Sequence, residues 1–210
     1  MIAGLLPPSV SCVERFDDAL DAELMPGEAE LIARAIEARR REFTTTRHCA
    51  RQALAVLGFP SVSILAGEHR EPCWPEGVVG SLTHCDGYRA AAVTTEWLSI
   101  GIDAEPAWPL PDGLLRIVAL PQDLAALPST SGVCWDRLLF SIKESVYKAW
   151  FSLTGRWLGF EEAEVVIDRD GTFRARLLVP GPPGITGFTG RWTVANGLIG
   201  TAVVVPQQGE

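Results

Sequence analysis

The sequence predicts an α+β protein, and two kinds of pattern carry that prediction. Apolar residues between Leu138 and Leu153 recur at spacings of three and four, which is typical of a half-buried helix. Runs such as residues 88–95 and 198–205 are rich in β-branched and aromatic residues and end at turn-forming residues, as strands do. Each half of the chain runs from helix to several antiparallel strands, so we expect helices packed on antiparallel sheets.

The first half is expected to open with a short strand over residues 10–15. A helix then begins at Pro26, followed by acidic residues that suit a first turn. Its buried stripe would be Leu31, Ile32, Ala35 and Ile36, and it would end in Arg39, Arg40 and Arg41. A second helical stretch over residues 46–57 is stopped by Gly58 and Pro60. Strands are expected over residues 62–65, 78–82, 88–95 and 98–102.

A change of composition after Glu105 indicates a domain boundary. Residues 106–113 are rich in proline and cannot continue a strand. We therefore divide the chain into an N-terminal half, residues 1–105, and a C-terminal half, residues 106–210. In the second half, helices are expected over residues 114–118, 122–127 and 134–152, and strands over 163–168, 172–178, 190–194 and 198–205. Residues 169–171 and 196–197 favour hairpin turns, and residues 207–210 are expected to fray.

Composition and charge limit the possible functions. The 210 residues are 47% hydrophobic and 21% charged, which is ordinary for a globular protein, and the net charge of −8 argues against nucleic-acid binding. The chain begins without a signal-peptide pattern and contains no apolar run of the ~18 residues that a membrane span needs. Five cysteines without regular spacing suggest reduced thiols. We expect a cytoplasmic protein that binds neither nucleic acid nor membranes.

Three carboxylates form a candidate metal site. Asp103 and Glu105 lie two apart at the end of an expected strand, so both point to one face. Like charges are tolerated best around a divalent cation, and oxygen-only ligands favour Mg²⁺ over zinc. Glu144 on the long helix would complete a site that still needs substrate phosphate oxygens, as in phosphoryl transfer. The alternative is a strand end with exposed acids and a solvated helical pair of Glu144 with Lys148.

The expected N-terminal helices carry the one dense basic cluster of this acidic chain. Its members are Arg39, Arg40, Arg41, Arg47 and Arg51. Guanidinium groups grip phosphate bidentately, so the cluster fits a phosphate-rich ligand. Compensation of a helix C-terminus by basic residues is the alternative interpretation.

Two stretches together resemble a known family. Gly101-Ile-Asp103-Ala-Glu105, followed by Phe140-Ser-Ile-Lys143-Glu144-Ser-Val-Tyr-Lys148, is similar to the paired signature of the Sfp-type 4′-phosphopantetheinyl transferases. Blocks beginning at Arg39, Arg47, Arg70 and Gly80 resemble further family motifs and occur in the family's order. The likeness is greatest to the actinobacterial and enterobactin-type members. It implies a pseudo-twofold architecture of two halves, each a helix packed on a mainly antiparallel sheet, with the active site between them.

The resemblance also implies a reaction. These enzymes move the 4′-phosphopantetheine group of coenzyme A to a serine of an apo acyl or peptidyl carrier protein and release adenosine 3′,5′-bisphosphate. The expected cofactor is Mg²⁺, with Mn²⁺ as a possible substitute, and the expected partners are coenzyme A and the carrier protein. Members of this branch are commonly monomers, and we expect the same here.

Residue roles follow from the matching motifs. Arg39 and Arg47 would contact the phosphates of coenzyme A, Thr83 and His84 its 3′-phosphate, and the Glu71-Pro72 backbone its adenine. Asp103, Glu105 and Glu144 would hold the metal, and Lys148 and Lys143 would bind phosphate oxygens. Glu144 or a metal-bound water would take the serine proton. Ala66 stands where relatives have a lysine, so His69 or Arg70 would have to supply that contact.

Other interpretations are weaker or remain open. A non-catalytic module that binds coenzyme A or a carrier protein would need the arginines but not all three carboxylates. The cysteines and histidines form no closed zinc set, and a hydrolase would need the nucleophile elbow Gly-x-Ser-x-Gly, which is absent. Residues 110–120 are apolar between proline-rich turns, and they form either a carrier-docking surface or ordinary core.

Overall fold

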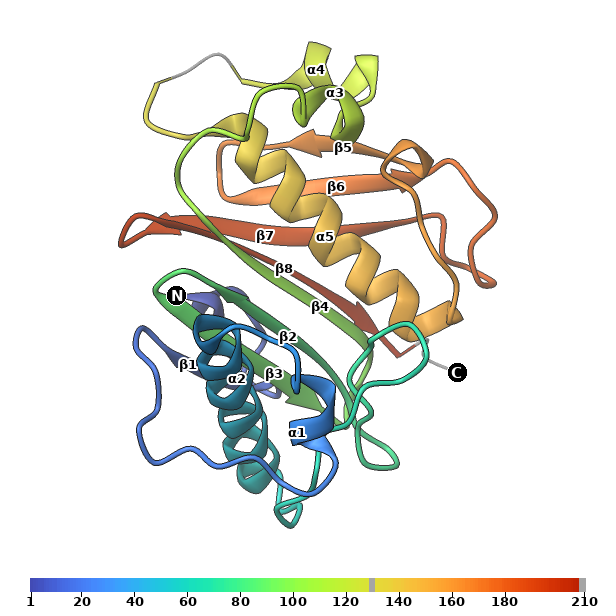
Figure 1. Ribbon diagram of the computed structural model, residues 1–210. Coiled ribbons are helices and arrows are strands. Elements are labelled where there is room, and N and C mark those ends of the chain that lie inside the picture. The colour runs from blue at the N-terminus through green and yellow to red at the C-terminus, as the bar shows by residue number, and fades with distance from the viewer. Residues whose placement is uncertain (129–130, 208–210) are drawn as a thin grey trace.

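The computed structural model describes residues 1–128 and 131–207, so residues 208–210 of the predicted frayed tail lie outside the described part. In chain order the elements are η1 (Ile2–Leu5), β1 (Ser11–Arg15), α1 (Glu28–Leu31), α2 (Glu37–Val56), β2 (Val79–Cys85), β3 (Tyr88–Thr94), β4 (Trp97–Pro106), α3 (Leu115–Val118), α4 (Pro121–Ala126), α5 (Trp135–Thr154), η2 (Phe160–Glu162), β5 (Ala163–Ile167), β6 (Thr172–Leu177), β7 (Gly187–Ala195) and β8 (Leu198–Pro206). Figure 1 shows two sheets, each with one long helix on the same side of the molecule. The predicted α+β class, with two halves, is confirmed.

The N-terminal sheet has the strand order β1-β3-β2, and every pair is antiparallel. Its central strand β3 is buried along its whole length. Ala91 and Val93 face α2, where they meet Cys49, Ala50 and Leu54. Small side chains on both surfaces allow the helix to lie close to the sheet. This packing fixes the helix that carries the arginines.

The C-terminal sheet has the order β4-β8-β7-β6-β5 and is also antiparallel. The β7–β8 hairpin turns at Asn196 and Gly197, with φ of 54° and 72°, as the Asn-Gly pair predicts. Helix α5 lies across this sheet (Figure 1) and buries Leu138, Ile142 and Val146 against it. Arg137, Glu144 and Lys148 of this helix are only partly buried, whereas its polar residues Ser141, Lys143 and Ser145 are buried.

The two sheets meet where β2 lies beside β4. Side-chain hydroxyls replace the backbone ladder there: Ser81 Oγ accepts from Ile102 N (3.0 Å), and Thr83 Oγ1 accepts from Ala104 N (2.9 Å). These two bonds flank Asp103 on either side. Strand β4 itself pairs along its length with β8.

Two local predictions are wrong. The helix expected over residues 26–41 is only the single turn α1, and the arginines belong to the start of α2; Leu31 and Ile36 are 42% and 76% exposed. The strand expected over residues 62–65 does not form. The backbone of Ile64 bonds instead to the side chains of Glu28 and Arg47, so it is unavailable to a ladder. No helix in the described part of the chain is long and apolar enough to cross a membrane.

Candidate active site

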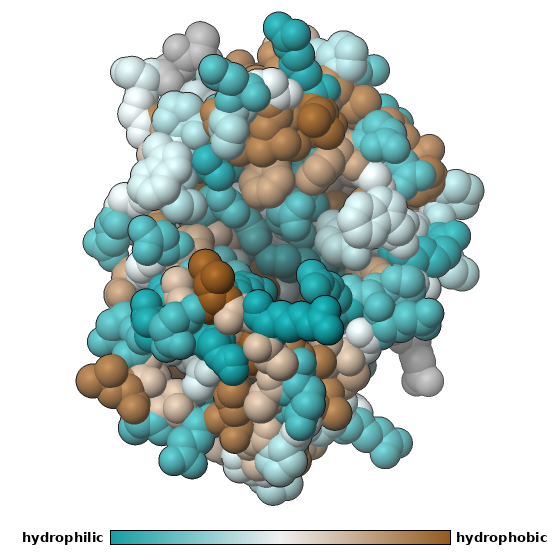
Figure 2. Space-filling model, viewed as in Figure 1, coloured by the Kyte–Doolittle hydropathy of each residue, from teal (hydrophilic) through white to brown (hydrophobic). Residues whose placement is uncertain are grey.

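A cleft of about 1150 Å³ lies between the two halves. Helix α2, the segment 66–72 and strand β2 supply one side, and β4 and α5 supply the other. Figure 2 shows a hydrophilic hollow across the middle of the molecule. Eight of the predicted site residues line the cleft: Arg39, Arg47, Glu71, Pro72, Thr83, His84, Asp103 and Lys148.

Asp103 is the best anchored of the predicted metal ligands. Its Oδ1 accepts from Lys148 Nζ (2.8 Å) and from Thr83 Oγ1 (3.4 Å), and its Oδ2 accepts from Ser141 Oγ (2.8 Å). The sequence analysis did not identify Ser141. Its hydroxyl also lies 3.0 Å from Thr201 Oγ1, so α5 and β8 together fix the orientation of the carboxylate.

Glu105 and Glu144 carry raised pKa values. Burial raises the pKa of the Glu144 carboxyl, and the negative charge of Asp103 raises it further. Burial and Asp103 also raise the pKa of Glu105, whereas its ion pair with Arg137 (2.8 Å) acts in the opposite direction. The three carboxylates therefore lie close enough to repel one another.

This set of donors fits a divalent cation. A hard cation bound by these oxygens would offset both the burial and the mutual repulsion that raise these pKa values. Among the described residues, however, no three His, Cys, Asp or Glu side chains are arranged so that they could hold a metal ion together. Asp103 instead pairs with Lys148, and Glu105 pairs with Arg137. Cationic side chains therefore already neutralise two of these carboxylates.

Arg39 and His84 form one polar wall of the cleft. Nη1 of Arg39 contacts both ring nitrogens of His84, at 3.1 Å from Nδ1, and lies 3.4 Å from Glu42 Oε2. Burial and then Arg39 lower the pKa of His84 to about 3, so the ring is neutral at pH 7. A neutral ring can accept a hydrogen bond from the guanidinium, and an approaching phosphate would find two donors here.

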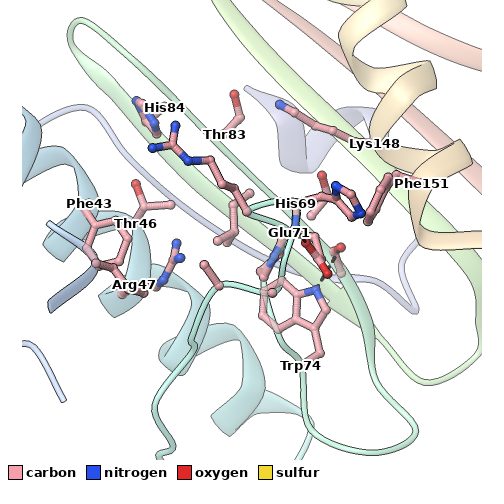
Figure 3. A pocket seen from close by; sticks show the side chains of 18 of the residues that line it. Phe43, Thr46, Arg47, His69, Glu71, Trp74, Thr83, His84, Lys148 and Phe151 are labelled. Atoms are coloured by element: carbon pink, nitrogen blue, oxygen red, sulfur yellow. Dashed lines mark hydrogen bonds between the residues drawn. The ribbon is translucent and has the colours of Figure 1, made fainter. Parts of the chain in front are cut away.

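Arg47 lies deeper in the cleft. Its side chain is 7% exposed, its guanidinium stacks on the ring of Phe43 at 4.1 Å, and its Nε donates to Ile64 O (2.9 Å). Figure 3 shows Phe43, Thr46 and Arg47 together at one end of the pocket.

The segment 66–72 closes the cleft on the side of the predicted adenine contact. Residues 66 and 72 form an isolated antiparallel bridge, and Glu71 caps the turn by accepting from His69 N (2.9 Å). The ring of His69 meets that of Phe151 on α5 at 5.5 Å, so the segment touches the other half of the molecule (Figure 3). Sequence reasoning did not select Phe151 or Trp74 as site residues, because an aromatic residue in a motif is more often core than pocket wall.

Lys143 is a predicted site residue that the structure buries away from the cleft. It is 3% exposed, and its Nζ pairs with Asp123 (2.6 Å) and donates to Phe160 O (2.8 Å). The helix turns it away from Lys148, toward α4 and η2. Glu105 and Glu144 lie near Asp103 but do not line the cavity.

Arginines of α2 thus face Asp103 and Lys148 across one cleft of about 1150 Å³, an arrangement that suits a phosphate-rich ligand. Comparison with known families agrees with a site of this kind. The family model described as "4'-phosphopantetheinyl transferase N-terminal domain" matches residues 27–94, and that described as "4'-phosphopantetheinyl transferase superfamily" matches residues 99–195. The chain belongs to the 4′-phosphopantetheinyl transferases.

Several relatives are similar along almost the whole chain. The chain is 52% identical to the 4'-phosphopantetheinyl transferase Svp of Streptomyces mobaraensis, over 98% of its own length and 89% of the relative's. It is 50% identical to the 4'-phosphopantetheinyl transferase Npt of Nocardia iowensis (97% and 99%) and 47% identical to PptT of Mycobacterium tuberculosis (98% and 98%). The predicted family and enzyme class are confirmed, and a non-catalytic module is not favoured.

Proposed function

We propose that this cleft transfers 4′-phosphopantetheine from coenzyme A to a serine hydroxyl of an apo acyl or peptidyl carrier protein. The observation that carries the proposal is the juxtaposition of Asp103 and Lys148 with Arg39, Arg47 and His84 around one cavity. Coenzyme A presents a pyrophosphate and a 3′-phosphate, which need several cations and neutral donors at once. Family membership supplies the transferase activity, and the cavity supplies a place for its phosphate-rich substrate.

Binding is assigned to the N-terminal wall. Arg39 and Arg47 contact phosphates through their guanidinium groups, and Thr83 and His84 lie against the 3′-phosphate. The backbone of Glu71 and Pro72 lies against the adenine. We assign Lys143 no part in binding, because its ammonium group is committed to Asp123. The predicted division into residues 1–105 and 106–210 is retained as a functional one, with binding on the first half and catalytic groups at its junction with the second.

The transfer forms a bond from the serine oxygen to the β-phosphorus of coenzyme A. The bond from that phosphorus to the adenosine bisphosphate oxygen breaks, and adenosine 3′,5′-bisphosphate leaves with the electron pair. Lys148 neutralises a phosphate oxygen, and Glu144, with its raised pKa, accepts the serine proton. We propose that Asp103, Glu105 and Glu144 hold Mg²⁺, with Mn²⁺ as a possible substitute; when bound, it neutralises charge on the pyrophosphate.

The carrier protein would dock beyond the catalytic carboxylates, on the short helices α3 and α4. Ile117 is 69% exposed and Leu124 is 45% exposed there, whereas Val118 is buried against the core. Part of the predicted segment 110–120 is thus core, and the exposed Ile117 in the same segment supports the proposal that a carrier protein docks there. Arg116 lies beside Ile117 and could meet an acidic carrier.

The test is the intact mass of an apo carrier protein after incubation with the enzyme, coenzyme A and Mg²⁺. We expect the mass of one phosphopantetheine to be gained, and the rate to fall by about 10² or more with Glu144→Gln. Glu164→Gln is the matched control, since that glutamate lies on the outer face of β5 in an ion pair with Arg176. Transfer that survives Glu144→Gln and chelation would overturn the assigned carboxylate roles.

A further inference from the structure

Glu28, on the single turn α1, is fully buried although it carries a charge. Its side chain is 0% exposed. Its Oε1 accepts from Ile64 N (2.8 Å), and its Oε2 accepts from Met25 N (2.8 Å). Arg51 Nη1 donates to both oxygens, at 2.9 Å from Oε1 and 3.1 Å from Oε2. A buried carboxylate is stable only when its hydrogen bonds are satisfied in this way.

The backbone of Ile64 connects this carboxylate to the cleft. Its N–H donates to Glu28, and its C=O accepts from Arg47 Nε (2.9 Å). Ile64 is itself 0% exposed, so the connection is shielded from water. The failure of residues 62–65 to form a strand follows from these two bonds.

Arg47 is left with free donors that face the cleft. Among the described residues, no hydrogen bond or ion pair engages its terminal nitrogens. Phe43 supports one face of the guanidinium, and Ile64 fixes its Nε. The contacts with Phe43 and Ile64 therefore fix the orientation of the two terminal nitrogens of Arg47 before any ligand binds. Figure 3 shows Arg47 beside Phe43.

The negative charge of Glu28 also stabilises the charged form of Arg47. Burial lowers the pKa of Arg47 to about 10, and Arg39 and Arg51 add to that lowering. Glu28 makes the largest contribution that raises it. The buried carboxylate is thus the counter-charge that offsets the cost of holding a cation in this position.

We propose that Glu28 is a positioning residue for coenzyme A binding, acting on Arg47 through the backbone of Ile64. The inference rests on the proposed role of Arg47 as a phosphate contact. Glu28 itself touches no substrate.

The test compares Glu28→Gln with the wild-type enzyme by titration calorimetry of coenzyme A and by steady-state kinetics. The Kd and KM for coenzyme A are expected to rise about threefold to tenfold, with kcat little changed, because the interaction with Arg47 is weakened and not removed. Glu28→Asp keeps the charge and shortens its reach; it is expected to weaken binding in the same direction if Glu28→Gln yields too little folded protein.

Asp123→Asn is the matched control. Asp123 is also a buried carboxylate that pairs with a cation, Lys143, and accepts from two backbone N–H groups, those of Leu120 and Val165. It lies away from the cleft in the C-terminal half. We expect Asp123→Asn to lower the Tm about as much as Glu28→Gln does, but to leave the Kd for coenzyme A unchanged.

A double-mutant cycle separates this inference from the proposed function. The effect of Glu28→Gln on the Kd should largely disappear in an Arg47→Ala background. Equal effects in both backgrounds, or an unchanged Kd with Glu28→Gln alone, would overturn the inference while leaving the role of Arg47 intact. An unchanged Kd with Arg47→Ala would instead refute the proposed phosphate contact itself.

Discussion

Two of the three carboxylates at the site have a direct neighbour that fixes their orientation or lowers their pKa. Asp103 accepts hydrogen bonds from Lys148 and Ser141, and Glu105 pairs with Arg137. Glu144 has no such direct partner among the described residues, and its pKa is raised. Glu144, the carboxylate without a direct hydrogen-bond or ion-pair partner, is therefore the one best suited to take up a proton.

His84 provides a prediction at this scale. Its pKa falls from 6.5 in the unfolded chain to about 3 in the folded one, so the native state binds fewer protons. Its contribution to stability is full above pH 6.5 and is lost as the pH falls toward 3. The slope is at most about 1.4 kcal/mol per pH unit, and less here because the side chain is 30% exposed.

Urea unfolding at pH 7.5 and pH 5 measures the effect. The wild-type protein should lose about 1 kcal/mol more than His84→Gln over this interval. His48→Gln serves as the control. Equal losses in the wild type and His84→Gln would show that the ring is already protonated in the folded protein or titrates as it does in the unfolded chain.

Helix α5 lies close to β4 because one glycine of that strand lets it approach. A Cβ built on Gly101 would lie 1.9 Å from Ser145 O and 2.7 Å from Ala149 N. Ser99 Oγ donates to Ala149 O (2.7 Å), which adds a direct bond between strand and helix. The spacing between Asp103 and Lys148 depends on this contact.

Gly101→Ala is therefore expected to push α5 outward. The clash is with backbone, which cannot move aside like a flexible side chain, so the loss should be about 3 kcal/mol or more. Denaturant midpoints and transferase rates would measure it. Gly4→Ala is the control, since a Cβ there meets nothing within 4 Å. A variant with native stability and rate would show that the helix does not need this approach.

At the scale of the whole molecule, we propose different surfaces for the two substrates. Coenzyme A is assigned to the cleft, and the carrier protein to the exposed side of α3 and α4. Ile117→Glu should therefore raise the KM for the carrier protein about tenfold and leave the KM for coenzyme A unchanged, as loss of an apolar contact does at an interface. Leu20→Glu, at a residue that is 100% exposed in the N-terminal half, is the control. An unchanged KM for the carrier would move the docking surface elsewhere.

Local periodicity was sufficient for most of the fold. The long helix, the strands that end at Asn196-Gly197, and the same-face placement of Asp103 and Glu105 follow from spacing and turn residues alone. The resemblance of the Gly101–Glu105 and Phe140–Lys148 motifs identified the family. These features depend on neighbours in the sequence, so the sequence by itself determined them.

Tertiary structure decided the rest, through contacts between residues far apart in the chain. The strand expected at residues 62–65 was lost because Glu28 and Arg47 take the hydrogen bonds of Ile64. Lys143 and Lys148 share one motif, but the helix turns the first toward Asp123 and the second toward Asp103. A buried ion pair or a side chain that replaces a ladder bond leaves no periodic trace in the sequence, because its partner can lie anywhere along the chain.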